Sequence, residues 1–466
     1  MLLHAFWRTA WTWAFLACIC STSSVLFAQD DNGDDDEDGD EIVSNMAGVA
    51  IDATGVLRVM QIDPRVANAQ RLATLQSTPR GQLKTSPMRK VSLNRLEEHV
   101  KQELSAGRKL SSEALSMAGL QRVEYVLYLP ETQDIVIAGP ADQWYADEAG
   151  RFVGLTNGRS TLHLEDMVVA LRAFGPDSGA TKTIGCSIDP TPEGLKRMEA
   201  FRSQFTQMPS DIRQYVAGMR NSLGMQVVSI RGVPRSTHFA RVLVEADYRM
   251  KLIGIGLADP LVPMKSWAER SQSSGGSNAL QRWFFEADYS TVASNESGTV
   301  MHLKGRGVKL SGAQEAVQSK TGTRSNTGRA GDAASVAFTK DFTNKFDDIA
   351  DATPVFHEMR NLFDMSVAAA FIQDRNLYEK ANWKLGSFAS EETFPVESGT
   401  EVSQVETAIN AFMRNNQLAT PIGGGVHIAA RSLVNPSKMT VSPQVEKDSE
   451  SMGAPKDLGN DQWWWD

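Results

Sequence analysis

The sequence predicts an α+β fold in which helices and β-hairpins are mixed along the chain. Segments with apolar residues at helical spacing follow β-rich segments in no regular order, which argues against the β-α alternation of a doubly wound sheet. The chain of 466 residues is 41% hydrophobic and 22% charged, as ordinary globular proteins are. Its three cysteines are too few to build a fold on disulfides.

Residues 1–28 have the pattern of a secretory signal peptide. A short segment with Arg8 precedes an apolar stretch, and a polar stretch ends at Ala28, after which we predict cleavage. The alternative is a leader retained as an anchor, although its apolar run is short for a bilayer span. Cleavage leaves a single thiol, Cys186, which lies in an apolar run and is expected to be a small buried residue rather than a nucleophile.

Residues 29–45 form a predicted disordered linker that is strongly acidic. Nine of the twelve residues in 30–41 are acidic, so the segment repels itself and has little apolar surface to bury. Three alternating aspartates followed by Gly39 imitate the start of a calcium loop, but Asn45 stands where such a loop carries glutamate. We therefore expect only a loose attraction of divalent cations here.

The body of the chain is nearly neutral. Outside the leader, the acidic linker and the residues from Met439 onward, it carries 44 basic and 41 acidic side chains. Such a body lacks the concentrated basic surface that binds a phosphate backbone. We therefore expect no nucleic-acid partner.

The first of two predicted subdomains covers residues 46–270. It opens with a hairpin whose turn contains Gly55, because β-rich segments flank a residue that tolerates a left-handed conformation. Capping residues such as Ser92 and the pair Thr191-Pro192 predict where two helices begin. The expected elements are a helix over 93–104, a hairpin over 122–138, a helix over 161–171, a strand over 183–188, helices from 191 and over 210–223, a strand over 225–231 and a helix over 237–253.

A spacer at 271–278, rich in serine and glycine, predicts the boundary to a second subdomain at 279–435. Glycine-rich triplets at 305–307 and 423–425 predict tight turns, since neither carries the flanking residues of a phosphate loop. The remaining expectations are paired strands at 282–287 and 299–304, a polar loop at 311–333, helices over 334–378, a further helix after Thr400 and a disordered tail at 436–466.

The helix over 237–253 has an apolar stripe on one side and a polar row on the other. His238, Arg241 and Glu245 follow at spacings of three and four, and opposite charges at such spacings are worth about 0.2–0.5 kcal/mol per exposed pair. One interpretation is a polar site in a cleft, with His238 as a base and Glu245 or Asp247 as an acid. We favour the other interpretation, a surface helix covered by ion pairs.

No motif assigns a metal, a cofactor or a catalytic residue. The seven histidines are scattered, and both H-E-x-x-H and paired cysteines are absent. His163 with Glu165, and His357 with Glu358, come closest, but adjacent or next-nearest residues on a helix do not face one ligand. We expect no metal and no cofactor, and the catalytic residues, if any, stay unknown.

Three tryptophans, Trp463, Trp464 and Trp465, are unusual in a solvated tail. A partner groove, a carbohydrate or a membrane interface could use exposed indoles. The alternative is that the tail packs back onto its own domain. The sequence does not decide between the two.

Four sequence blocks of the body, between about residue 46 and residue 430, are similar to those of a known protein family. They are Asp134–Pro140, Ile184–Gly194, Phe239–Gly256 and Pro354–Phe371. Together they resemble a family of exported planctomycete proteins that is defined only as a domain of unknown function. The resemblance implies an extracytoplasmic setting and no particular fold, activity, substrate or catalytic residue.

These observations favour an exported, non-catalytic protein that is a binding or structural component of the cell envelope, in the periplasm or outside the cell. Its expected partner is a protein or an envelope component. No stable membrane span is expected after leader cleavage, and the oligomeric state is not predicted. The alternative is an extracytoplasmic hydrolase that acts on wall or polysaccharide material through carboxylates such as Glu165, Asp166 or Glu193.

Overall fold

The fold is α+β, as the sequence predicts. The computed structural model describes residues 44–466 except 47–48, 53, 61–63, 80–83, 148, 180, 182, 206–209, 272–279, 318–323, 411–422, 454–457 and 460–461. The predicted leader, nearly all of the acidic linker and most of the serine-rich spacer lie outside the described residues. In the part that is described, no helix is both long and apolar enough to cross a bilayer.

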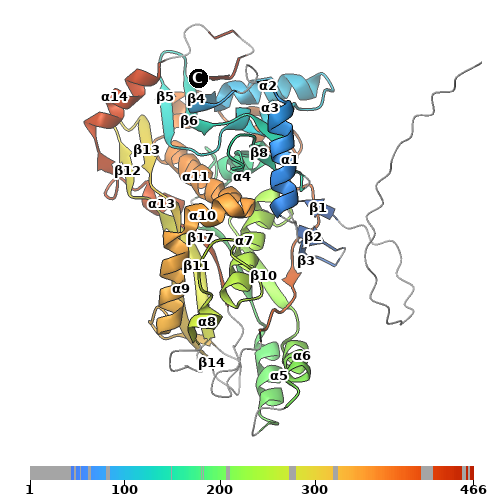
Figure 1. The fold of residues 1–466 in the computed structure, drawn as a ribbon. Coiled ribbons are helices and arrows are strands. Elements are labelled where there is room, and N and C mark those ends of the chain that lie inside the picture. The colour runs from blue at the N-terminus through green and yellow to red at the C-terminus, as the bar shows by residue number, and fades with distance from the viewer. Residues whose placement is uncertain are drawn as a thin grey trace, which may run out of the picture. The chain divides into compact units, whose positions relative to one another are not determined.

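The larger of two main sheets has ten strands. In order across the sheet they are β1 (Ser44–Met46), β2 (Val49–Ile51), β3 (Val56–Val59), β16 (Gln404–Val405), β10 (Gln226–Arg231), β9 (Ile184–Asp189), β17 (Gly423–Ile428), β11 (Leu280–Asp288), β14 (Gly307–Val317) and β15 (Arg324–Asn326). Neighbours are antiparallel except where β16 lies beside β3 and β11 beside β17. Figure 1 shows β10, β11 and β17 below the centre of the molecule.

The second sheet has seven strands and lies at the other end of Figure 1. Its order is β18 (Thr440–Val441), β12 (Thr291–Ser294), β13 (Val300–Lys304), β5 (Tyr125–Leu129), β6 (Asp134–Ala141), β4 (Ser86–Ser92) and β19 (Trp464–Trp465). A separate hairpin joins β7 (Trp144–Ala146) to β8 (Phe152–Gly154).

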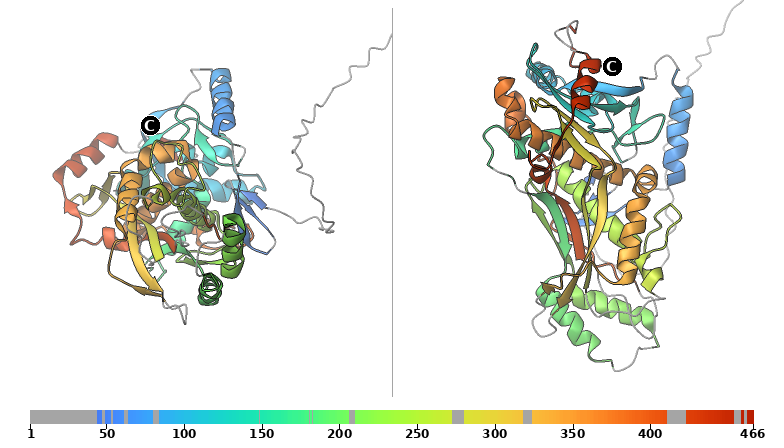
Figure 2. Two further views of the ribbon diagram at one scale, coloured as in Figure 1. Left: turned by 60° about the horizontal axis from the view of Figure 1, so that its bottom comes forward. Right: turned by 90° about the vertical axis from the view of Figure 1, so that its left-hand side faces the viewer.

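Two long helices, α7 (His238–Gly254) and α11 (Pro354–Asp374), run through the middle of the molecule (Figure 1). α7 packs against β9 and β17, and α11 packs against α7 and α4 (Leu164–Ala173). The other helices are α1 (Pro64–Ser77), α2 (Leu93–Ser105), α3 (Ser112–Leu115), α5 (Pro192–Arg202), α6 (Ile212–Leu223), α8 (Trp267–Ser271), α9 (Ala333–Asn344), α10 (Phe346–Ala352), α12 (Leu377–Lys380), α13 (Ala430–Leu433) and α14 (Pro443–Met452). Figure 2 shows α5 and α6 together at one end.

A cluster of phenylalanine rings holds α9 and α11 against β11. Phe338 and Phe342 lie four residues apart on α9 and therefore share a face. The rings of Phe285 and Phe356 pack on Phe342 at centroid distances of 5.8 and 5.7 Å. All four side chains are fully buried, and burying each contributes about 1.5–3 kcal/mol. This packing fixes the position of α11.

Most of the predicted local signals are confirmed. Gly55 lies at a turn with a φ of 82° between β2 and β3. Ser92, Thr191 and Thr237 each accept a hydrogen bond from a backbone N–H in the first turn of α2, α5 and α7. The hairpin of β5 and β6 is also present. Side chains that satisfy a backbone group locally are therefore reliable markers of where these elements begin.

Long-range pairing differs from the prediction. The segments at 282–287 and 299–304 do not pair, because β11 lies between β14 and β17 while β13 lies between β12 and β5. The pairs β9–β17 and β5–β13 also join strands from both sides of the spacer at 271–278. Residues Ile42–Asp466 accordingly form one unit rather than two subdomains. A hydrophobic pattern locates a strand without specifying its neighbour.

Three further predictions of loops or helices are wrong where the structure describes them. The polar loop at 311–333 begins in β14, whose polar side chains pair across strands, as when Ser311 donates to Glu286 at 2.6 Å. The stretch after Thr400 contains the short strand β16 instead of a helix. The triplet 423–425 opens β17 rather than forming a turn, whereas Gly305 and Gly307 do have positive φ angles.

The predicted disordered tail at 436–466 is also wrong for its described residues. Pro443–Met452 is the helix α14, and β19 pairs with β4. Trp463 is only 4% exposed, and the Asp466 carboxylate accepts two hydrogen bonds from Arg89 at 2.8 and 3.0 Å. The tail packs on its own sheet because the indole rings supply the apolar area that its charged residues lack.

Replacing Gly425 by alanine should destabilise the larger sheet. A Cβ atom at this position would overlap the carbonyl oxygen of Cys186 on the neighbouring strand, and relieving such an overlap costs about 1–3 kcal/mol. Urea unfolding measures the change in the free energy of unfolding. The matched control is Gly179→Ala, because nothing lies within 4 Å of a Cβ there. Equal stability of both variants and the wild type would contradict the close packing of β9 and β17.

Replacing Trp463 by alanine should lower the free energy of unfolding by about 3–5 kcal/mol, the usual cost of removing a fully buried aromatic side chain. Thermal and urea unfolding report the loss. The control is Trp465→Ala, since Trp465 is only half-buried and its removal should cost less than half as much. An unchanged melting temperature for the Trp463 variant would show that the tail is not part of the fold.

Candidate functional site

The polar row of α7 is buried, so the prediction of a surface helix is wrong. His238 is 7% exposed, Arg241 1%, and both Glu245 and Asp247 are fully buried. The cause is the position of α7 between the ten-stranded sheet and the helices α4 and α11, which cover its two sides. Burying charged side chains is costly unless they are paired, so their partners decide what this region does.

His238 pairs with Asp166, one of the carboxylates considered for a hydrolase. The two Asp166 oxygens lie 2.9 and 3.1 Å from His238 Nδ1. Burial opposes the charge on His238, but the Asp166 carboxylate prevails and raises its pKa to about 9. His163 stacks on His238 at 4.8 Å, and burial together with the neighbouring imidazolium lowers the pKa of His163 to about 4. His238 is therefore protonated at neutral pH, which does not suit a general base.

Arg151 joins α7 to α11. It donates to Glu245 Oε2 at 2.8 Å and to Glu358 Oε2 at 2.7 Å, and all three side chains are buried. Arg249 donates to the other oxygen of Glu245 at 2.7 Å. The cluster of Arg151, Glu245, Glu358 and Arg249 thus ties the β7–β8 hairpin and two helices together. We assign it to holding the fold.

The other residues singled out in the sequence are separate from these pairs. Asp247 pairs with Lys251 at 2.9 Å on α7. Cys186 is buried in β9, and burial raises the pKa of its thiol, which agrees with the prediction of an inert residue. Glu165 is half-buried with its pKa raised by burial, and Glu193 is exposed in the first turn of α5.

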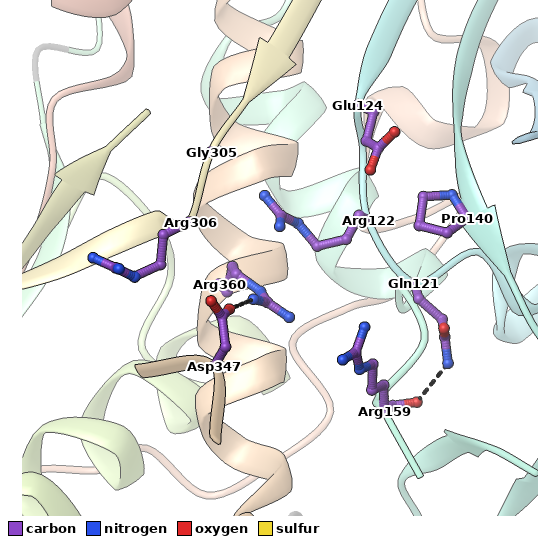
Figure 3. A pocket seen from close by; sticks show the side chains of 9 residues that line it. All are labelled: Gln121, Arg122, Glu124, Pro140, Arg159, Gly305, Arg306, Asp347 and Arg360. Carbon is purple, nitrogen blue, oxygen red and sulfur yellow. Dashed lines mark hydrogen bonds and ion pairs between the residues drawn. The ribbon is translucent and has the colours of Figure 1, made fainter. Parts of the chain in front are cut away.

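A polar pocket of about 400 Å³ lies where the seven-stranded sheet meets α10 and α11 (Figure 3). It is lined from the residues before β5, from β6, from the segment after β8, from the turn between β13 and β14, and from both helices. The lining residues are Gln121, Arg122, Glu124, Pro140, Arg159, Gly305, Arg306, Asp347 and Arg360. Four arginines against two carboxylates make the lining positively charged.

α11 contributes Arg360 to the pocket lining, and two neighbours of Arg360 on the same helix face lie behind it. His357, Arg360 and Asp364 lie three and four residues apart and share one face. Arg360 is 4% exposed; it donates to Asp347 Oδ1 at 2.7 Å and to Nδ1 of His357. This places the His357 proton on Nε2, 2.7 Å from Asp351. Burial, helped by Arg360, lowers the pKa of His357 to about 4, so the imidazole is neutral.

Arg122 and Arg159 are each held by an aspartate. Arg122 donates from Nε and Nη2 to Asp364 at 2.5 and 3.2 Å, and Arg159 donates from the same two nitrogens to Asp351 at 3.0 and 3.1 Å. In both arginines Nη1 takes no part in the pair. Gln121 donates to the carbonyl oxygen of Arg159 at 3.1 Å and so fixes the backbone that carries this guanidinium.

The cations of the pocket are crowded. Figure 3 shows the side chains of Arg159 and Arg360 directed toward each other and Arg306 directed away. Burial, together with the charge of Arg122, lowers the pKa of Arg360 to about 10. Burial makes the largest contribution to this shift, and the positive charges of Arg122 and Arg159 add to it. An anion placed between Arg159 and Arg360 would favour the charged form of Arg360.

No motif in the sequence predicts this pocket. His357 and Glu358 are adjacent in the sequence, but His357 bonds to the pocket residue Arg360 whereas Glu358 bonds to Arg151. One signal was available: the segment 354–374 is otherwise apolar and fully helical in pattern, yet it carries polar residues at spacings of three and four. Polar residues that recur on one face of a buried helix must have partners or ligands there.

The fold and the pocket together define an α+β protein with a polar, arginine-lined site. Residues 186–267 match the model of a family described as a protein of unknown function (DUF1598), so this part of the chain is similar to that family, as the sequence predicts. The match runs from β9 to the start of α8, includes α7, and contains none of the pocket residues. No curated protein and no solved structure matches the chain. Within the described ranges, no three His, Cys, Asp or Glu side chains are placed to hold a metal ion.

The stability of the protein should fall between pH 6.5 and pH 9 because of His238. Its folded pKa of about 9 exceeds the ordinary value of 6.5, so the Asp166 pair stabilises the fold fully below pH 6.5 and is lost as pH rises through 9. The full loss in the free energy of unfolding is on the order of 3 kcal/mol. Urea unfolding at pH 6.5 and 9 measures it.

The variants His238→Gln and Asp166→Asn serve as comparison in this experiment. Both should be less stable than the wild type at pH 6.5. In both, the free energy of unfolding should fall much less between pH 6.5 and pH 9 than it does in the wild type. A wild-type stability that declines no more than that of either variant would show that the pair does not stabilise the fold.

Proposed function

We propose that this protein is a non-catalytic binding protein that takes a small anion, a carboxylate or a phosphate, in the arginine-lined pocket. The observation that carries the proposal is the convergence of Arg122, Arg159 and Arg360 on one cavity of about 400 Å³. A cavity of this size lies within the range of small-molecule sites, about 300–1,000 Å³.

The aspartates behind the guanidiniums support binding rather than oppose it. Asp364 and Asp351 each hold an arginine through two parallel hydrogen bonds, which fixes the plane of the guanidinium. Donors held in place lose little conformational entropy when a ligand arrives. The Nη1 groups of Arg122 and Arg159 then remain as the donors that can meet an anion.

The architecture of α11 also supports a site that does not change shape on binding. Arg360 is held between Asp347 and His357, and α11 is fixed by the phenylalanine cluster and by the hydrogen bond that Arg151 donates to Glu358. A rigid, polar, preformed pocket suits recognition of a small ligand.

We further propose that the protein acts outside the cytoplasm, as a component of the cell envelope. Two sequence features support this setting: the signal-peptide pattern of residues 1–28 and the resemblance to exported proteins. A hydrolase remains the second candidate, but His238 is protonated, and Glu245 and Glu358 each form an ion pair with Arg151, which makes these three groups poor general bases.

Replacing Arg159 by glutamine should weaken the binding of inorganic phosphate and of acetate about tenfold. The reason is the loss of a charge-assisted hydrogen bond worth about 1.5–3 kcal/mol, at the lower end here because Arg159 is partly exposed. Isothermal titration calorimetry at constant ionic strength gives the dissociation constants. Arg159 is 45% exposed, so the variant is expected to fold normally.

The matched control is Arg306→Gln, which removes an arginine of the same lining whose side chain points away from Arg159 and Arg360 (Figure 3). Its phosphate affinity should change less than threefold. Equal losses in both variants would mean that only the general positive charge matters. The absence of phosphate and acetate binding to the wild type would refute the proposed function.

A further inference from the structure

The chemistry of the pocket lining restricts the ligand beyond its negative charge. Pro140 is the only apolar side chain among the nine lining residues, and none of them is aromatic. A lipid tail or a flat aromatic base would find no apolar or stacking surface here. The ligand must therefore be polar over most of its surface, as well as anionic.

Two carboxylates face the same cavity as the arginines. Glu124 is half-buried, and among the described residues no side chain donates a hydrogen bond to it. Figure 3 shows its carboxyl group between Arg122 and Pro140. Asp347 is 60% exposed and meets Arg360 through one oxygen, which leaves the second oxygen outside that bond. Both groups offer acceptors for hydroxyl donors.

The two carboxylates weaken the binding of an anion that has no hydrogen-bond donor to offer them, because their negative charge repels it. Glu124 repels a carboxylate or phosphate that approaches Arg122, and burial already raises the pKa of Glu124. The combination becomes favourable for a ligand that presents an acid group to the arginines and hydroxyl groups to the carboxylates. The half-buried Glu124 would then contribute to selectivity, because a ligand without a hydroxyl donor leaves this carboxylate without a partner in the complex.

We propose that the ligand is a sugar acid: a hydroxylated ring that carries one carboxylate or phosphate. This inference rests on the proposed function. The acid group binds between Arg159 and Arg360, near the Nη1 group of Arg122, and the ring hydroxyls donate to Glu124 and Asp347. No bond is made or broken.

The experiment is calorimetric titration of the full protein with glucuronate, glucose 6-phosphate, acetate, inorganic phosphate and glucose at one ionic strength. Glucuronate should bind at least tenfold more tightly than acetate, and glucose 6-phosphate at least tenfold more tightly than phosphate. Glucose should bind at least tenfold more weakly than either sugar acid. The tighter of the two sugar acids identifies the head group as carboxylate or phosphate.

The Glu124→Ala variant separates the role of the hydroxyl acceptor from that of the charge. It should reduce the advantage of glucuronate over acetate to less than threefold without weakening acetate itself, because a negative charge has been removed. The matched control is Glu296→Ala, an exposed glutamate in the turn between β12 and β13, which should leave every affinity unchanged.

The outcomes distinguish the inference from the proposed function. Acetate and phosphate that bind as tightly as the two sugar acids would overturn the inference and leave the anion site standing. Glucose that binds as tightly as glucuronate, with no effect of Arg159→Gln, would overturn both. Failure of all five probes would also overturn both, starting with the proposed function.

Discussion

The interior of this protein depends on one constraint: charged side chains that are taken out of water must be paired. Arg151 satisfies it for two helices at once, because it is buried and bonded to Glu245 on α7 and Glu358 on α11. Removing one partner of such a cluster leaves an uncompensated buried charge, which costs several kcal/mol. The relative position of α7 and α11 is therefore specified by chemistry as well as by apolar packing.

The same constraint operates on the opposite face of α11, with a different result. There Arg360 and Asp364 are paired with residues that are themselves only partly enclosed, and a cavity remains among them. One helix thus carries a sealed ionic cluster on one side and an accessible one on the other. The sealed side gives the helix its position, and the accessible side gives the pocket its charge.

Local chemistry was predictable from the sequence, and long-range assembly was not. Ser92, Thr191 and Thr237 mark helix starts because each satisfies a nearby N–H, and Gly55 marks a turn because it adopts a positive φ. The burial of α7 was not predictable, because charged residues at helical spacing give the same sequence pattern whether their ion pairs are exposed or buried. The pocket was missed because its arginines come from segments up to some 240 residues apart, and only pairing between distant strands brings them together.

The pairing of β19 with β4 has a consequence for the order in which the molecule can assemble. Arg89 and Asp466, which meet at this edge, are 377 residues apart along the chain. β4 is made early, but its outer edge stays open to other strands until the tryptophans of β19 have emerged. Contacts of such long sequence separation form late and slowly, and an open edge invites pairing with other chains. The time between synthesis of β4 and arrival of β19 is therefore the period in which this protein is most exposed to aggregation.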